Sequence, residues 1–342
     1  MRKDVNTALD KILNGRDKLK EIITLNELIE RLEEKKKIVS LWGVTPKIIH
    51  LGYDRFIVKQ MDLIEVGFKH NIIIADLYLL YQEDDKKDII KLKTKYFIHY
   101  LKLVGLKKAK FITLSRLEKK RKFWEYFYLV SKNAKLSEME KLGVLRNKNS
   151  LGSFICAGFQ LIDHLVLSAD VVYGGKDQRG IYILSREICK KEKLNKPIIL
   201  LGELSHDILG RYLSQSRLET RITIHDNFDT LFYKIKKMFC PPNIVENNPV
   251  LEYLKFSVFP FFNEIIVRAK HGKIEIKRYE ELEELYRKGF IHPLDLKKTL
   301  YEYLKTRISK IQQYFEKRKK LIEWIDLNLI NKNSTNRNKV MK

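Results

Sequence analysis

The sequence has few cysteines, few prolines and no long apolar segment, and each shortage excludes a class of protein. Among 342 residues there are three cysteines and seven prolines. Cys156, Cys189 and Cys240 form no CxxC pair, which excludes a disulfide framework and a cysteine zinc site. No apolar run reaches the roughly 18 residues of a membrane-spanning helix, and residues 1–6 lack the apolar core of a secretory signal. We therefore expect a cytoplasmic protein without a membrane segment.

Acidic residues are also scarce relative to basic ones. The 67 Lys and Arg against 43 Asp and Glu give a formal net charge of +24. This excess favours a polyanionic partner, with nucleic acid the first candidate. A compositional bias toward Lys, Ile and Asn is the alternative, because charge alone carries no specificity. With 44% hydrophobic residues the chain is too apolar to be disordered, and its length suggests about two domains.

Short apolar runs alternate with helical periodicity over the first two thirds of the chain. The strand-like runs are residues 36–42, 71–77, 109–114, 170–173 and 197–201. Helical patterns occupy residues 5–37, 51–68 and 152–167. Strands that alternate with helices predict a parallel α/β sheet, and continuous apolar runs are typical of strands covered on both faces.

The pattern changes after about residue 220, and from Asn227 onward it is helical with few strand candidates. Residues 293–320 form the clearest helix, with one apolar stripe. The stripe contains Leu296, Leu300, Leu304, Ile308, Ile311 and Phe315. The opposite face carries Lys297, Lys298, Lys305, Arg307, Lys310 and residues 317–320. That face is either solvated or follows the phosphates of a nucleic acid.

A first polar cluster, His50 and Gly52, precedes the predicted helix of residues 51–68. Amide groups at a helix start attract phosphate, and a glycine lets the chain approach it closely. The HxG pattern is common by itself, so a structural histidine is the alternative.

A second cluster follows the run 170–173, where Gly174 and Gly175 free the backbone at the carboxyl end of a strand. Open α/β sheets bind ligands at such ends, although a plain strand-to-helix turn would look the same.

A third cluster, Cys156, Gln160 and Asp163, lies on one face of the helix 152–167, because its spacings are four and three. The rest of this helix is apolar, and a carboxylate there is costly to bury unless a hydrogen bond compensates it. The side chains therefore either bind a ligand or point into solvent.

Together, the order and spacing of these clusters resemble those of the class I tyrosyl-tRNA synthetases of archaea and eukaryotes. HLGY at residues 50–53, QxxD at 160–163 and GGxDQR at 174–179 carry the resemblance. Three further segments, residues 75–77, 240–249 and 292–297, are similar to the family's ADLH, CP…NP and HPMDLK stretches. The resemblance covers about residues 20–325.

The resemblance implies an α/β fold with a Rossmann-like parallel-sheet catalytic domain over residues 1–224. A mostly α-helical anticodon-binding domain would follow over residues 225–330, and a polar, disordered tail over 331–342. An insertion at roughly 85–165 would form the contact of a homodimer. The implied activity is tyrosine–tRNA ligation, with tyrosine, ATP and tRNA(Tyr) as substrates, Mg²⁺ accompanying ATP and no protein-bound metal.

The resemblance also implies roles for individual residues. The catalytic set would be His50, Gly52, Ser214 and Ser216. ATP would contact these four residues and Gly174, Gly175 and Arg217. Tyrosine would be bound by Leu41, Cys156, Gln160, Asp163 and Gln178, with Asp163 accepting a hydrogen bond from the phenol and the two glutamines orienting the amino group. Arg179 would contact the acceptor stem of the tRNA and Asp295 its anticodon.

Some positions depart from the family pattern. Tyr212 stands where the KMSKS motif has its lysine, and losing this cation should slow adenylation. Arg211 and Arg217 are the candidate replacements, although guanidinium and ammonium groups are not interchangeable. Leu41 and Cys156 replace two tyrosines of the family's pocket.

Two departures lie elsewhere in the chain. The loop at residues 45–47 is one residue short, and Lys270 replaces an aromatic residue that stacks on the anticodon.

These departures leave two alternatives to the ligase. A paralogue that binds RNA without aminoacylation is favoured by Tyr212 and Leu41. It is opposed by the retained polar residues Gln160, Asp163, Gln178 and Arg179. A generic basic RNA-binding protein would leave both GGxDQR and HxG unexplained. We therefore expect the enzyme.

Overall fold

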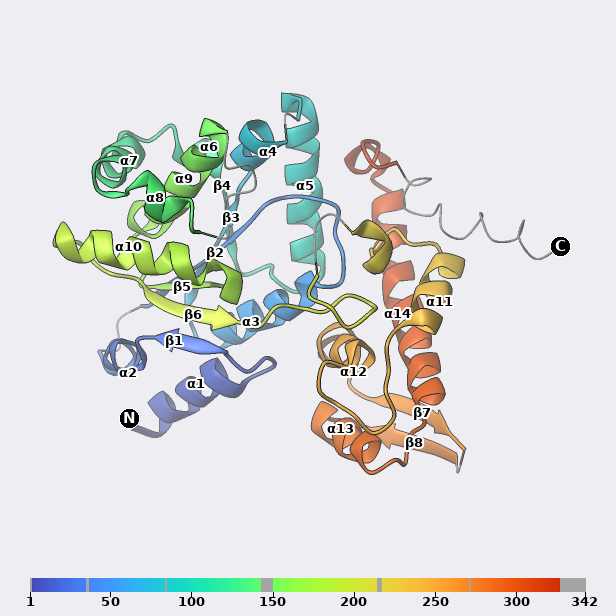
Figure 1. Cartoon of the computed structure of the whole chain (residues 1–342). Coiled ribbons are helices and arrows are strands. Elements are labelled where there is room, and N and C mark those ends of the chain that lie inside the picture. The colour runs from blue at the N-terminus through green and yellow to red at the C-terminus, as the bar shows by residue number, and fades with distance from the viewer. Residues whose placement is uncertain are drawn as a thin grey trace. The chain divides into compact units, whose positions relative to one another are not determined.

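The computed structural model describes residues 2–34, 37–83, 85–142, 150–213, 217–270 and 272–326. The chain forms two compact units (Figure 1). Unit 1 comprises residues 1–47 and 59–203, and unit 2 comprises residues 48–58 and 204–342. The predicted tail at 331–342 lies outside the described residues. No helix in the described ranges is long and apolar enough to cross a membrane.

Unit 1 contains a six-stranded sheet in the order β1-β6-β5-β2-β3-β4. The strands are β1 (Glu21–Ile23), β2 (Val39–Val44), β3 (Lys69–Ile74), β4 (Lys110–Thr113), β5 (Val171–Gly175) and β6 (Ile198–Gly202). All neighbours pair in parallel except β1, which pairs antiparallel with β6. The α/β fold is therefore confirmed, and all five predicted runs contain strands.

Helices connect these strands. They are α1 (Arg2–Asn14), α2 (Leu25–Glu33), α3 (Tyr53–Glu65), α4 (Leu77–Gln82), α5 (Lys87–Leu103), α6 (Leu114–Leu117), α7 (Arg121–Asn133), α8 (Leu136–Met139), α9 (Leu151–Leu167) and α10 (Arg179–Lys191), with a 3₁₀ turn η1 (Lys176–Gln178). The prediction that residues 5–37 are only helical is wrong, because β1 lies within them. Three residues are too few to show a strand period, and their partner β6 is distant in sequence.

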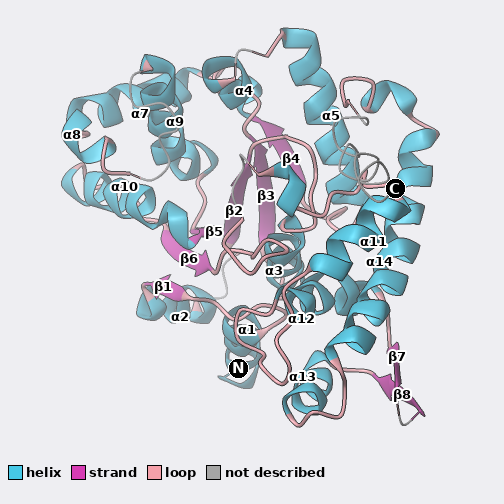
Figure 2. Cartoon of the chain, turned by 45° about the vertical axis from the view of Figure 1, so that its right-hand side comes forward, coloured by secondary structure: helices cyan, strands magenta, loops and turns pink. Residues whose placement is uncertain are grey.

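The helices α9 and α10 lie on one side of the unit 1 sheet, and α5 lies on the other (Figures 1 and 2). Leu41 of β2, Ile73 of β3 and Val172 of β5 belong to the same buried cluster as the apolar side chains of α9 and α10. Because α9 packs on this side of the sheet, its polar residues lie on the same side as these three strand residues.

Unit 2 is mainly helical and contains one hairpin. Its helices are α11 (Phe228–Lys237), α12 (Pro249–Tyr253), α13 (Tyr279–Arg287) and α14 (Pro293–Glu316), with short turns η2 (Leu218–Thr220), η3 (Leu254–Val258), η4 (Phe259–Phe261) and η5 (Lys319–Leu321). Strands β7 (Ile265–Ala269) and β8 (Gly272–Ile276) form an antiparallel hairpin. The predicted apolar stripe of α14 is buried.

Arg307 of α14 is buried, with only 6% of its surface exposed, so its assignment to the charged outer face is wrong. Its Nη2 donates to Oδ1 of Asp54 at 2.9 Å, and its Nη1 donates to the carbonyl of Ser257 at 3.1 Å. The guanidinium also lies 3.8 Å from the ring centre of Phe261. Position 307 follows Leu304 by three residues, so helical spacing already places it beside the apolar stripe.

We expect Arg307→Ala to lower the free energy of unfolding by about 3–5 kcal/mol, because it leaves the buried Asp54 carboxylate without its counter-charge. Urea unfolding followed by circular dichroism measures this change. The exposed Lys310 of the same helix is the matched control, and Lys310→Ala should change stability by less than about 0.5 kcal/mol. Equal effects of the two substitutions would contradict a buried ion pair.

Candidate active site

The face of the unit 1 sheet that α9 and α10 cover is open above Gly43. This glycine lies in β2, a central strand between β5 and β3, yet it is exposed. A Cβ atom added to it would meet none of the described atoms within 4 Å. On β5, Gly174 lies one residue beyond Tyr173, which pairs with Trp42. Gly43 therefore leaves an open hollow on this face of the sheet, whereas the space above Gly174 is occupied by Tyr182, whose ring would lie 2.9 Å from an added Cβ atom.

Gly43 was not among the predicted site residues. A glycine inside an apolar strand often marks a place where another group approaches the backbone closely, so the sequence did contain a signal.

The structure brings Gln160 of α9 and Gln178 of η1 together, as their predicted common role requires. Nε2 of Gln160 donates to Oε1 of Gln178 at 2.7 Å. Nε2 of Gln178 in turn donates to Oδ2 of Asp177 at 2.7 Å. Because a carboxylate can only accept, Asp177 fixes the orientation of both amides along this chain of hydrogen bonds.

Asp163 of α9 has a buried oxygen in apolar surroundings. The residue keeps part of its surface exposed, but its Oδ1 is sealed and has no hydrogen-bond partner among the described residues. Burial raises the pKa of this carboxyl group to about 8, because a charge is poorly solvated there. A ligand that donates a hydrogen bond would compensate the penalty.

Leu41 and Cys156 are both buried, and neither offers a hydroxyl group. Tyr78 of α4 lies beside position 156, because its hydroxyl donates to the carbonyl of Cys156 at 2.6 Å. Tyr182 of α10 is a second phenol that the sequence analysis missed, and a hydrogen bond joins it to Gln160. Its position four residues after Gln178 was the available signal.

In unit 2, His50 lies three residues before the start of the 13-residue helix α3. Burial, together with the positive charge of Arg221, lowers the pKa of His50 to about 3, so the ring is neutral at pH 7. Its Nδ1 has no hydrogen-bond partner in the described parts of the chain. A Cβ atom on Gly52 would lie 2.1 Å from Cδ1 of Leu213 and 2.9 Å from this Nδ1, so any other residue would displace one or both side chains.

Tyr212, at the position of the missing lysine, is exposed and stacks on His206 with the ring centres 4.9 Å apart. Arg217 donates from Nη2 to the carbonyl of Tyr212 at 3.0 Å. Both arginines also reach Oδ2 of the buried Asp207, with Nη2 of Arg211 at 3.1 Å and Nη2 of Arg217 at 4.0 Å. Ser214 and Ser216 lie outside the described residues.

Arg221 is a further basic residue that the sequence analysis did not single out. It is buried, and burial lowers its pKa below the usual value of an arginine. Tyr53, Tyr253 and Glu219 raise its pKa and Arg217 lowers it, while Arg221 itself lowers the pKa of the neutral His50. Two guanidinium groups therefore lie near His50. Such a group of cations suits a phosphate.

The remaining predicted residues lie on the surface of their units. Arg179 is exposed, and its Nε lies 2.8 Å from Oε2 of Glu21. Asp295 lies in the first turn of α14, with Oδ1 3.6 Å from Nζ of Lys298. Lys270 is exposed directly after β7. The roles proposed for Arg179 and Asp295 remain predictions.

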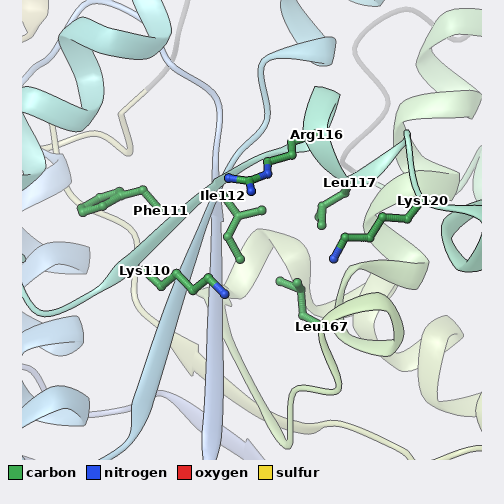
Figure 3. Close-up of a pocket in the computed structure, with 7 residues that line it drawn as sticks. All are labelled: Lys110, Phe111, Ile112, Arg116, Leu117, Lys120 and Leu167. Carbon is green, nitrogen blue, oxygen red and sulfur yellow. The ribbon is translucent and has the colours of Figure 1, made fainter.

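A cavity of about 140 Å³ lies at the β4 edge of the sheet (Figure 3). It is lined by Lys110, Phe111, Ile112, Arg116, Leu117, Lys120 and Leu167. None of the predicted site residues lines this cavity. Leu167, at the end of α9, is its one residue from the helix that carries Gln160 and Asp163.

The buried carboxyl group of Asp163 generates a prediction on stability. Its folded-state pKa of about 8 exceeds the ordinary value of 3.8. Burial therefore costs no stability below pH 3.8, and the penalty grows until about pH 8. Without ligand, Asp163→Asn should raise the free energy of unfolding by about 1–3 kcal/mol at pH 8, and by much less at pH 4.

Urea unfolding at the two pH values measures this difference. The exposed Asp88 supplies the control, because Asp88→Asn should change stability little and equally at both pH values. An Asp163→Asn effect that does not depend on pH would contradict the burial of the carboxyl group.

Comparison with known proteins places these observations in a family. A model described as tRNA synthetases class I (W and Y) matches residues 32–309. The tyrosine–tRNA ligase of Saccharolobus solfataricus is 28% identical over 337 residues, which cover 89% of this chain and 92% of that protein.

Two solved structures are similar over almost the whole chain. One is a tyrosyl-tRNA synthetase from Archaeoglobus fulgidus complexed with L-tyrosine, with a TM-score of 0.82, 28% identity and coverage of 93% of this chain and 99% of that one. The other is a tyrosyl-tRNA synthetase from Aeropyrum pernix, with a TM-score of 0.79, 24% identity and coverage of 98% and 100%. Since the family model spans most of the sequence, the chain belongs to the class I tRNA synthetases of the tryptophan and tyrosine family.

Proposed function

We propose that this chain joins tyrosine to tRNA(Tyr) in two steps, with the polar residues of α9 and η1 holding the amino acid. The function is that of a tyrosine–tRNA ligase, and like other members of its family the enzyme uses ATP as a substrate. The observation that carries the assignment of the pocket is the lone buried oxygen of Asp163 in unit 1, which also contains the open position Gly43.

The phenol of tyrosine matches this pocket. Its hydroxyl would donate to Asp163, and its ring would pack against Leu41. Phenylalanine would leave the buried carboxylate without a donor, so the site would reject it. Gln160 and Gln178 would receive the amino group, because Asp177 already holds their amides in one orientation.

The first step would be attack of the tyrosine carboxylate on the α-phosphorus of ATP. A carboxylate–phosphorus bond forms while the bond to the β-phosphate oxygen breaks, and pyrophosphate leaves. No general base is needed, because the carboxylate is ionised at pH 7. The work is positioning and charge stabilisation. His50, Gly52 and the start of α3 would hold the phosphates.

Arg217 would supply the charge that Tyr212 cannot, supported by the nearby Arg221. Ser214 and Ser216 would contact the nucleotide from the same motif. Gly174 and Gly175 would allow it to approach β5.

In the second step, a terminal ribose hydroxyl of tRNA would attack the tyrosyl carbonyl, and AMP would leave. We propose that Mg²⁺ enters with ATP and is coordinated by its phosphates. The described residues contain no group of three metal-ligating side chains that could hold it, and we assign the ion no step.

The tRNA would meet Arg179 at its acceptor stem and Asp295 at its anticodon, and the charge of +24 would attract it. A catalytic domain over residues 1–224 and an anticodon-binding domain over 225–330 would divide this work. We further propose a homodimer through residues 85–165, where Tyr128, Leu136 and Leu151 are 66%, 64% and 73% exposed. The free cysteines are compatible with the reducing cytoplasm.

Tyrosine-dependent ATP–pyrophosphate exchange by the purified chain tests this function. Exchange should require tyrosine and should not be supported by phenylalanine. Gly43→Val should abolish exchange and tyrosine binding, because the new side chain fills the hollow. Stability should change little, because valine suits a strand and meets open space. Absence of exchange in the parent protein, with tRNA binding intact, would favour the RNA-binding paralogue.

The choice between the two arginines gives a separate prediction. Arg217→Ala should slow exchange by about 100-fold or more, because a cation at the transferring phosphoryl group is lost. Arg211→Ala should slow it by less than about tenfold, because Arg211 is held more closely by Asp207, at 3.1 Å against 4.0 Å for Arg217. Tyrosine binding should survive both substitutions. A larger loss for Arg211→Ala would reverse the assignment.

A further inference from the structure

The amino-acid pocket lacks two hydroxyl groups. The positions that resemble the family's pocket tyrosines carry Leu41 and Cys156, and neither side chain can donate a hydrogen bond as a phenol does. Position 156 is the one expected to face the amino group of the substrate. No hydroxyl at position 156 can therefore help Gln178 to hold the amide of Gln160, one helical turn further along α9.

Tyr182 is placed to do so. It projects from α10 against Gly174, since a Cβ atom there would lie 2.9 Å from its ring and 3.2 Å from its hydroxyl oxygen. A hydrogen bond joins its hydroxyl to the side chain of Gln160, and the carboxylates of Asp163 and Asp177 lie close enough to act on it. The phenol is buried, and every polar neighbour named here belongs to the pocket.

The hydrogen bonds run in one direction through these residues. Asp177 accepts from Gln178, and Gln178 accepts from Gln160. One N–H of the Gln160 amide is used in the hydrogen bond to Gln178. The second N–H and the carbonyl oxygen of this amide remain available to the hydroxyl of Tyr182. An amide held at both ends loses less entropy when it binds a ligand, so it binds more tightly.

We propose that Tyr182 is a positioning residue for the amino group of the substrate. Its hydroxyl fixes the Gln160 amide and so replaces the hydroxyl that is missing at Cys156. The inference rests on the proposed function, because it assumes that the pocket binds tyrosine. A tyrosine that only filled the core could be exchanged for phenylalanine without consequence.

Tyr182→Phe tests this, because it removes the hydroxyl and keeps the ring. Two ligands separate the amino group from the rest of the substrate: L-tyrosine, and 3-(4-hydroxyphenyl)propionate, which has the same phenol and carboxylate but no amino group. Titration calorimetry gives both affinities. The matched control is Tyr173→Phe, since Tyr173 is a buried tyrosine of the neighbouring β5 that points to the opposite face from Gly174.

We expect Tyr182→Phe to weaken L-tyrosine binding about tenfold, the worth of one hydrogen bond. Binding of the propionate should change by less than about twofold, and Tyr173→Phe should leave the ratio of the two affinities unchanged. Equal weakening of both ligands, or no weakening of either, would overturn the inference alone. If the parent protein does not bind L-tyrosine, the proposed function fails and the inference fails with it. Thermal unfolding checks that each variant folds.

Discussion

One buried carboxyl oxygen in unit 1 needs a hydrogen-bond donor that the described protein atoms do not provide. Asp163 lies on an apolar helix, and its Oδ1 is sealed from solvent without a partner in the described structure. The charged form of such a group is stable only if a ligand donates a hydrogen bond to it. Without a ligand the carboxyl group stays protonated to a higher pH, which is why its pKa is raised. In the proposed function, the open Gly43 and the paired glutamines shape and orient the ligand that supplies the donor.

Unit 2 presents the opposite electrostatic problem. There burial keeps His50 neutral and opposes the charge of Arg221. Buried carboxylates balance other cations of the unit, since Asp54 pairs with Arg307 and Asp207 with Arg211. In the proposed function, the cations near His50 bind an anion, whereas the unit 1 pocket binds a hydrogen-bond donor.

Regular patterns were the easiest part of the fold to predict. The apolar runs located β2 to β6, and three-to-four spacing located α9 and α14, because these elements bury a whole face or both faces. By contrast, β1 has three residues and depends on a distant partner, so no local period reveals it. Arg307 was misplaced because its charge outweighed its position beside the apolar stripe.

The site residues also divide into those that a local sequence pattern reveals and those that depend on distant partners. Helical spacing and the GGxDQR segment located Gln160, Asp163 and Gln178, and the structure joins the two glutamines directly. Gly43, Tyr182 and Arg221 were missed because their significance depends on which atoms lie opposite them. A glycine is notable in a central strand only when the space above it is open, and a buried phenol only when its hydroxyl meets a polar group.

The ion pair between Asp54 and Arg307 affects more than the stability of unit 2. Asp54 lies in the first turn of α3, two residues after Gly52, the turn to which the proposed function assigns the phosphates of ATP. Arg307 neutralises its charge from a helix more than two hundred residues later in the chain. An anion approaching the start of α3 therefore meets a carboxylate that is already paired, which links the packing of α14 to the electrostatics of this helix start.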